Sequence, residues 1–181
     1  MTSTSNTKTI KYTYRFRLYP DSDQMHRLSK SFGSVRYVYN HFLREEKDNY
    51  KLNHTHLGYY TNAKTLTVLK NECPFLKECN SQSLQHSLKH LERAYINFFE
   101  KRGEEPTFKK KSRHHDSFTV PQFCEIDDKY IYFPKFKQGI RCRFHRQVEG
   151  TMLFVILFAT VLVNLFVKNL MIKTSNEVLV F

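Results

Sequence analysis

The sequence predicts an α+β fold in which β-strands at both ends of a basic segment flank a block of helices. Apolar and polar residues alternate with a period of two over residues 10–18, as in a strand with one buried face. Apolar residues then recur at helical spacing from about residue 21 to residue 101. The alternation returns between residues 103 and 150, so the chain should return to the sheet that it left.

The first strand, over residues 10–18, is expected to place apolar and basic residues on opposite faces. The residues expected on the buried face are Ile10, Tyr12, Tyr14, Phe16 and Leu18. The residues expected on the exposed face are Lys11, Thr13, Arg15 and Arg17. Pro20 ends the strand, because proline cannot donate to the ladder of hydrogen bonds. The cations on the exposed face suit contact with phosphate groups.

A helix is predicted directly after this proline. Asp21 is a good N-cap, and Gln24 stands three residues further on, as in a capping box. Gly33 is predicted to end the helix, because glycine disfavours helix interiors.

A second helix is predicted from Ser34 to about Lys51. Two helices around a short glycine turn form a helix-turn-helix candidate, although ordinary helical hairpins share this pattern. If the pair binds nucleic acid, Arg36 and Arg44 of the second helix are the expected contacts.

Two further helices are predicted before the second β-rich region. One covers residues 61–71 and leads to a turn at Pro74. The other is capped by Ser81 and runs for about five turns. Its apolar stripe consists of Leu84, Leu88, Leu91, Tyr95 and Phe98. We expect this stripe to belong to the core or to face a partner.

The segment between residues 103 and 150 is predicted to contain a basic loop followed by strands. The cations of the loop are Lys109, Lys110, Lys111 and Arg113. Strands are predicted around residues 118–120, 130–133 and 140–144, and the last of these should point Arg141 and Arg143 toward solvent. Arginine-bearing strands on both sides of a helical insert predict a small barrel interrupted by a helical lobe.

The composition favours a nucleic-acid partner. Lysine and arginine total 29 against 17 acids, which gives a formal net charge of +12. The aromatic residues are 11 tyrosines and 16 phenylalanines. Cations that meet phosphates and rings that stack on bases suit RNA or single-stranded DNA. The alternative is a basic protein whose aromatic residues all lie in its core.

The cysteines and the N-terminus predict a cytoplasmic protein with reduced thiols. Cys73, Cys79, Cys124 and Cys142 lack the paired short spacings of a structural zinc site. Residues 1–9 are polar and lack the apolar run of a signal peptide.

Six blocks of the sequence together resemble one protein family. They are Tyr14–Pro20, Phe32–Asn40, Ser81–Gln85, Arg93–Phe99, Pro106–Lys109 and Phe144–Arg146. In order and spacing they are similar to the TnpB (OrfB) family of insertion-sequence transposons, from about residue 10 to residue 150. No single block is decisive, but their combination is highly specific.

Members of this family are RNA-guided DNA nucleases related to the type V CRISPR effectors. The resemblance implies that strands within residues 8–19 and 106–150 form a wedge-like β-barrel. It implies that helices within residues 21–101 form a recognition lobe with a helix-turn-helix start. These parts would hold a guide RNA and help to read a short motif beside the DNA target, while base pairing to the guide supplies most of the specificity.

The composition changes sharply after residue 150, where the family continues into a RuvC-like nuclease domain with three metal-binding acids and a four-cysteine zinc ribbon. In residues 151–181 the only acid is Glu177, and there is no Cys or His. Several converging carboxylates are needed to hold the cations of phosphodiester cleavage. We therefore expect a fragment that binds nucleic acid and has no catalytic residue, metal site, cofactor or small-molecule substrate.

Two explanations of residues 151–181 remain open. The run from Met152 to Val167 is almost wholly apolar, so residues 152–172 could form a transmembrane or membrane-surface helix. The chain would then be a single-pass membrane protein with a basic cytoplasmic domain. The favoured explanation is a frameshift near residue 150 that leaves an aberrant apolar tail. A barrel that lacks its closing strand would expose an edge and promote aggregation.

The expected organisation is a first barrel strand in residues 1–20, a helical lobe in 21–102, further barrel strands in 103–150 and the tail in 151–181. The expected partners are guide-type RNA and DNA. The residues expected to contact them are Lys11, Arg15, Arg17, Arg36, Arg44, Lys109, Lys110, Lys111, Arg113, Arg141, Arg143 and Arg146.

Overall fold

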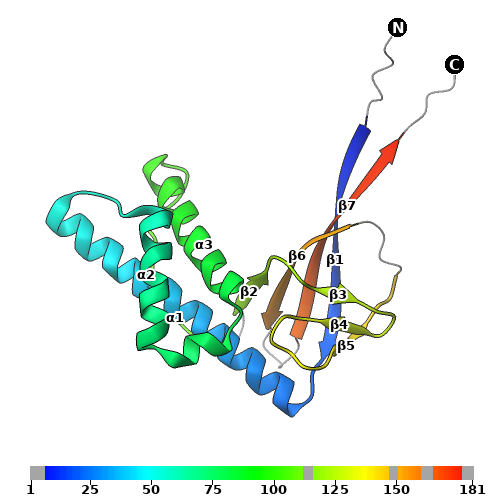
Figure 1. Ribbon diagram of the computed structural model, residues 1–181. Helices are drawn as coiled ribbons and strands as arrows, with labels where there is room; N and C mark the ends of the chain where they lie inside the picture. Colours follow the sequence, from blue (N-terminus) through cyan, green and yellow to red (C-terminus); the bar gives the residue numbers. More distant parts are fainter. Residues whose placement is uncertain (1–6, 112–115, 147–150, 160–164, 177–181) are drawn as a thin grey trace, which may run out of the picture.

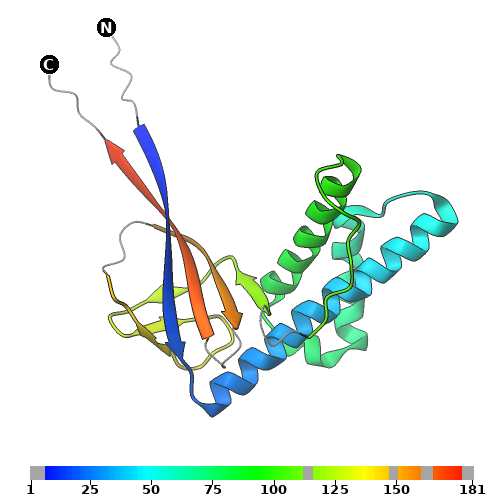
Figure 2. The same ribbon diagram turned by 180° about the vertical axis from the view of Figure 1, so that it is seen from behind.

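The computed structural model describes residues 7–111, 116–146, 151–159 and 165–176, and it has an α+β fold. Three α-helices gather on one side and a curled sheet lies on the other (Figure 1). The view from behind shows the longest helix running from the foot of the first strand into the helical part (Figure 2). The predicted fold class of strands around a helical insert is therefore confirmed at this coarse level.

The strands form a single antiparallel sheet. They are β1 (Thr7–Tyr19), β2 (Ser117–Val120), β3 (Glu125–Ile126), β4 (Tyr130–Tyr132), β5 (Ile140–Arg143), β6 (Thr151–Ala159) and β7 (Leu165–Asn176). Their order is β2-β6-β7-β1-β5-β4-β3. Within the described residues β2 and β3 are the two edges of an open sheet, so the expected wedge-like barrel is not confirmed.

The predicted alternation of β1 is confirmed where its side chains are described. Phe16 and Leu18 are buried, whereas Thr13, Arg15 and Arg17 are exposed. β5 repeats the pattern, because Ile140 and Cys142 are buried and the two arginines between and after them are exposed. The inner face of the sheet therefore belongs to the core, and its outer face carries the cations.

The apolar segment after residue 150 forms strands, which corrects both the expected membrane helix and the expected missing strand. β6 pairs with β7, and β7 pairs with β1 from Thr7↔Asn176 to Leu18↔Leu165. Val155 and Leu157 of β6 are fully buried in the common core. The extension supplies core side chains and pairs with one edge of β1, so the segment after residue 150 does contribute strands to the sheet.

The first two predicted helices are one helix, α1 (Ser22–Asn53). The expected break at Gly33 is wrong, because buried residues continue along one face on both sides of it, including Leu28, Val35 and Phe42. A glycine inside a helix costs about 1 kcal/mol, and burial of two or three such side chains outweighs that cost. The connection between helices lies instead at residues 54–57, before α2 (Gly58–Glu72).

The predicted capping box at the start of α1 is confirmed. The Asp21 carboxylate accepts from the Gln24 backbone N–H at 2.7 Å, and the Gln24 side chain accepts from the Asp21 N–H at 3.1 Å. The Gln24 amide also donates to the Gly139 carbonyl at 3.2 Å, which ties α1 to the turn before β5. A side chain at Gly139 would collide with the Tyr132 ring and with Cβ of Tyr130, so this position requires glycine.

The remaining helices agree closely with the sequence prediction. A 3₁₀ helix, η1 (Pro74–Glu78), follows α2, and α3 (Ser81–Phe99) comes next. The N-cap of α3 is Asn80 and not Ser81, because the Asn80 side chain accepts from the Gln82 N–H at 3.2 Å. The predicted stripe of α3 faces the core at Leu84, Leu88, Leu91 and Tyr95, whereas Phe98 at the end of the helix is exposed.

Glu46 is a buried acid that joins the three helices. One of its carboxylate oxygens lies 2.9 Å from His56 Nδ1, and the His56 Nε2 lies 2.9 Å from the Glu92 carboxylate of α3. The Leu57 and Gly58 N–H groups at the start of α2 donate to Glu46 at 3.1 and 3.3 Å. The Glu46 side chain thus replaces an ordinary N-cap for α2 and compensates its own burial with hydrogen bonds.

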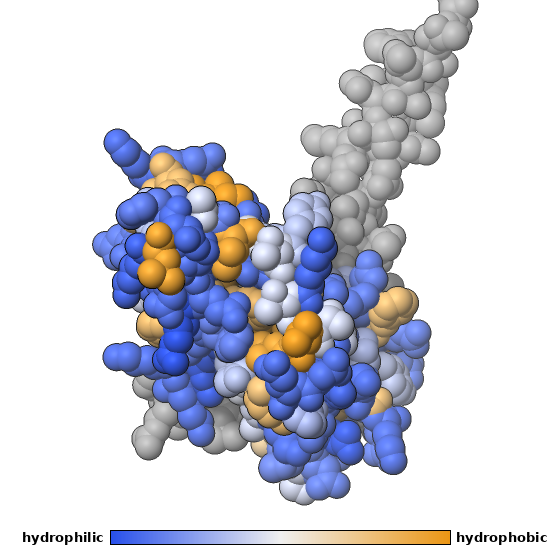
Figure 3. All heavy atoms as spheres, turned by 60° about the vertical axis from the view of Figure 1, so that its left-hand side comes forward, coloured by the Kyte–Doolittle hydropathy of each residue, from blue (hydrophilic) through white to orange (hydrophobic). Residues whose placement is uncertain are grey.

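The described residues give no support to a membrane span or to disulfides. No helix among them combines the length and the apolar character that crossing a bilayer requires. On the face shown in Figure 3, hydrophilic residues cover most of the surface and hydrophobic residues form separate patches. All four cysteines are free, and burial raises the pKa of the Cys79 thiol to about 11.

Replacement of Glu46 by alanine tests whether the helical part depends on this acid. We expect a loss of about 3 kcal/mol in the free energy of unfolding, since buried donors lose their partner. Urea unfolding followed by circular dichroism measures it. Glu104→Ala, at an exposed position with no polar partner among the described residues, is the control. Equal stability of the two variants would show that Glu46 has no such role.

Candidate nucleic-acid interface

Arginines and aromatic rings share the outer face of the sheet in register. Phe158 of β6 is the register partner of Phe166 of β7. On its other side Phe166 is paired with Arg17 of β1, and Arg17 is in turn paired with Arg143 of β5. One row thus crosses four strands with two rings followed by two arginines. Neighbouring strands lie about 4.8 Å apart, so the row is continuous along the surface.

A second row lies two residues further along β1. Tyr19 stands opposite Arg141 of β5, and Arg141 stands opposite Tyr130 of β4. Both tyrosines are exposed to 41%. The outer-face patch is defined here as both rows together with Arg15, that is Arg15, Arg17, Tyr19, Tyr130, Arg141, Arg143, Phe158 and Phe166.

Contacts with rings position two of the arginines. The Arg15 guanidinium lies 4.9 Å from the centre of the Phe158 ring and 4.3 Å from that of Phe166. These two rings stack on each other with centroids 5.5 Å apart. The Arg17 guanidinium lies 5.2 Å from the centre of the Tyr19 ring. Stacking restricts a guanidinium to one orientation while its N–H groups remain able to donate.

The patch is hollowed near its second row. A depression of about 510 Å³ is lined by Tyr19, Lys129, Arg141 and Arg143, with Asp128 as its acid. A nucleotide-sized group can enter such a depression, where cations outnumber acids. Of the predicted contacts, Arg15, Arg17, Arg141 and Arg143 are therefore brought together on one surface.

Arg36 is held inside the fold by an acid. Its guanidinium donates to the Asp116 carboxylate at 3.0 and 3.1 Å, and both side chains are about one-fifth exposed. Asp116 precedes β2, so this ion pair ties α1 to the edge of the sheet. Arg36, predicted to contact nucleic acid, has its charge neutralised within the chain.

The basic loop lies along α1. The Asn40 side chain donates to the Lys109 carbonyl and accepts from the Lys109 N–H, both at 2.8 Å. The Lys109 ammonium lies 4.0 Å from the centre of the Tyr39 ring, and loss of surrounding water lowers the pKa of Lys109. Lys110 and Lys111 are exposed. Lys109 thus anchors the loop, and the two lysines that follow it extend into solvent.

The other predicted contacts are scattered. Arg44 is exposed beside a groove on α1 that is also lined by Tyr37 and His41. Arg146 is exposed just after β5. The side chain of Lys11 and the whole of Arg113 lie outside the described part of the chain.

Sequence reasoning missed the aromatic half of the outer-face patch. Phe158 and Phe166 lie in the segment interpreted as a tail, and Tyr19 and Tyr130 were assigned no role. A signal was available for Tyr130, because it alternates with the buried Ile131 in a predicted strand. Among the described residues, no group of three His, Cys, Asp or Glu side chains is placed to hold a metal ion.

The fold and the outer-face patch define a basic α+β module with cations and aromatic rings on one side of an open sheet. A family model described as a helix-turn-helix domain, HTH_OrfB_IS605, matches residues 10–55. Residues 10–55 thus match the helix-turn-helix domain of the TnpB/OrfB family, and the comparisons support a transposon-associated nucleic-acid-binding role.

Two curated relatives extend the similarity beyond the helix-turn-helix. The chain is 38% identical over 141 residues to "Putative RNA-guided DNA endonuclease InsQ" of Escherichia coli (strain K12), which covers 76% of this chain and 35% of the relative. It is 36% identical over 118 residues to "Putative RNA-guided DNA endonuclease" of Streptomyces pristinaespiralis, covering 63% of this chain and 29% of the relative. The chain thus matches about a third of the length of these relatives.

Two arginines of α1 allow a matched test of the Arg36–Asp116 ion pair. Arg36→Ala should lower the free energy of unfolding by about 1.5 kcal/mol, because a partly buried, charge-assisted contact is lost. Arg44→Ala removes the same side chain from an exposed site and should change stability by less than about 0.5 kcal/mol. Thermal unfolding of both variants measures the difference. Equal losses would contradict the structural role of Arg36.

Proposed function

We propose that this chain binds nucleic acid through the outer-face patch, as the nucleic-acid-holding part of a TnpB-like, RNA-guided system. The observation that carries the proposal is the pair of rows in which arginines and aromatic rings are register partners across neighbouring strands. Rings supply stacking surfaces for bases, and arginines supply donors for phosphates.

The preferred partner of this patch is RNA with unpaired bases. Stacking needs a base whose face is free, which a regular duplex does not offer along its length. The relatives' names refer to RNA guidance, and the patch has the chemistry that a guide would need. The exposed Lys110 and Lys111 and the exposed Arg146 add charge that a longer strand could use.

DNA is the second proposed partner, through the helical part. The helix-turn-helix match includes α1, whose exposed Arg44 lines a groove with Tyr37, Asn40 and His41. Because Arg36 is paired with Asp116, we assign the contact in this region to Arg44 alone. We place the chain in the cytoplasm with these partners.

We propose binding, and not cleavage, as the activity of this chain. In the family that the sequence resembles, the metal-binding acids follow the region of similarity. The buried acid Glu46 has a structural role, because its oxygens accept from the Leu57 N–H and the Asn62 amide and lie 2.9 Å from His56 Nδ1. Incubation with single-stranded RNA or DNA and Mg²⁺ should leave the strands intact, and protein-dependent cleavage would contradict this part.

Arg141→Gln/Arg143→Gln tests the outer-face patch. Affinity for single-stranded RNA should fall about tenfold, because two charge-assisted contacts are lost. The plot of log affinity against log salt concentration should become shallower by about 2, since each phosphate contact contributes about one unit. Fluorescence anisotropy at several salt concentrations measures both quantities.

A matched control removes the same charge elsewhere. Lys64→Gln/Lys101→Gln changes two exposed cations of the helical part that have no polar partner among the described residues. This variant should keep RNA affinity within about twofold, because remote charges are screened at physiological salt. If both variants lose affinity equally, binding is a general effect of net charge and the outer-face patch is not the site.

A further inference from the structure

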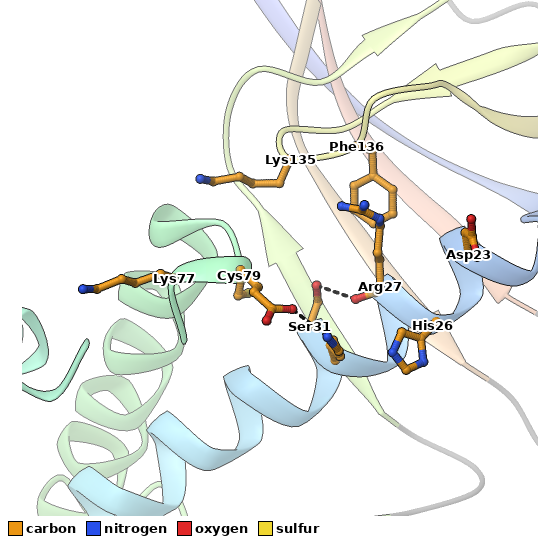
Figure 4. A pocket seen from close by; sticks show the side chains of 10 residues that line it. Asp23, His26, Arg27, Ser31, Lys77, Cys79, Lys135 and Phe136 are labelled. Atoms are coloured by element: carbon orange, nitrogen blue, oxygen red, sulfur yellow. Dashed lines mark hydrogen bonds and ion pairs between the residues drawn. The ribbon is translucent and has the colours of Figure 1, made fainter. Parts of the chain in front are cut away.

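A basic hollow lies where the helical part meets the sheet, and it shares no residue with the outer-face patch. It measures about 530 Å³. Its walls come from the first turns of α1, from η1 and from the 133–139 loop between β4 and β5 (Figure 4). Its shape therefore depends on how the helices pack against the sheet.

Three cations at this hollow form no ion pair within the part of the chain that the structure describes, although Arg27 acts with Lys30 in lowering the pKa of Glu78. Lys30 forms an ion pair with Glu78 at 2.8 Å and lowers the pKa of Glu78, so these two charges neutralise each other. Among the described residues, no carboxylate oxygen lies within 4.0 Å of Arg27, Lys77 or Lys135. The hollow thus combines one guanidinium and two ammonium groups from three separate segments.

The remaining lining adds little negative charge near the lysines. Cys79 is buried, and burial raises the pKa of its thiol to about 11, so it is neutral at physiological pH. The Ser31 hydroxyl donates to the Arg27 carbonyl at 3.0 Å. Asp23 lies at the opposite end of Figure 4 from Lys77 and Lys135.

Lys135 has an uncommon backbone conformation. Its φ of 72° lies in the left-handed region, which residues with a side chain rarely adopt. Residues held in such conformations are concentrated at ligand-binding sites. In Figure 4 its side chain and that of Lys77 extend toward the same side of the hollow.

We propose that this hollow binds a phosphate group. A phosphate monoester carries up to two negative charges and three acceptor oxygens, which match one guanidinium and two ammonium groups. Arg27 would supply paired N–H donors, and the two lysines would supply point charges. The phosphate can be free, or it can belong to a nucleic-acid strand, whose phosphodiester presents one negative charge and two unesterified oxygens to the same cations. The site does not depend on the outer-face patch.

Calorimetric titration of the full chain with inorganic phosphate tests this site. Lys77→Gln/Lys135→Gln should weaken phosphate binding about tenfold, because two charge-assisted contacts are lost. Lys64→Gln/Lys101→Gln removes equal charge elsewhere and should keep the phosphate affinity within about twofold. An equal loss in both variants would overturn the proposal. The NMR signal of Arg27 reports on this hollow alone and separates this proposal from the preceding one.

Two measurements on the unmodified chain complete the test. The NMR signal of the Arg27 Nε–H should shift saturably with phosphate, and an unchanged signal would overturn the site even if a variant failed to fold. Single-stranded RNA should then be added to the phosphate-bound chain. Displacement of phosphate identifies a strand phosphate as the ligand, and retention identifies free phosphate, while both outcomes support the site.

Discussion

The pairing of β1 along both of its edges determines where every other part of this protein lies. One edge pairs with β7 as far as Leu18↔Leu165, and the other pairs with β5 at Arg17↔Arg143. Side chains alternate along a strand, so this register puts Phe16 in the core and Arg17 outside. A slip of one residue would bury the arginines without partners, at a cost far above that of any single exposed contact. The same strand register therefore determines both the packing of the core and the positions of the residues in the outer-face patch.

Much of the fold could be predicted from local patterns, because these patterns have local causes. The capping box of Asp21 and Gln24 involves residues three apart, and its hydrogen bonds are those that the sequence predicts. The predicted helix break at Gly33 was wrong because it rested on the low intrinsic helix propensity of glycine. Packing of the helix face against the other elements keeps the helix continuous. The N-cap of α3 was predicted one residue too late, at Ser81 in place of Asn80. Both residue types are good N-caps, and only the backbone geometry selects one of them.

The long-range parts could not be predicted in the same way. A short apolar run has no period that separates a buried strand from a helix, which is why β6 and β7 were interpreted as a membrane helix or an aberrant tail. The Arg36–Asp116 pair joins residues 80 positions apart, so the chemistry of Arg36 alone could not show that its charge is neutralised. Exposure of Arg141 and Arg143 was predictable from alternation, but their neighbours across the strands depend on the sheet order.

Ultraviolet cross-linking of the unmodified chain to single-stranded RNA, followed by mass spectrometry of the linked peptides, tests the central claim most directly. Bases that stack on the outer-face patch should cross-link to Tyr19, Tyr130, Phe158 and Phe166. Two exposed rings of the helical part, Tyr60 and Phe75, serve as internal references on the same molecule. The account predicts cross-links concentrated on the four patch residues. Cross-links confined to the helical rings would contradict it.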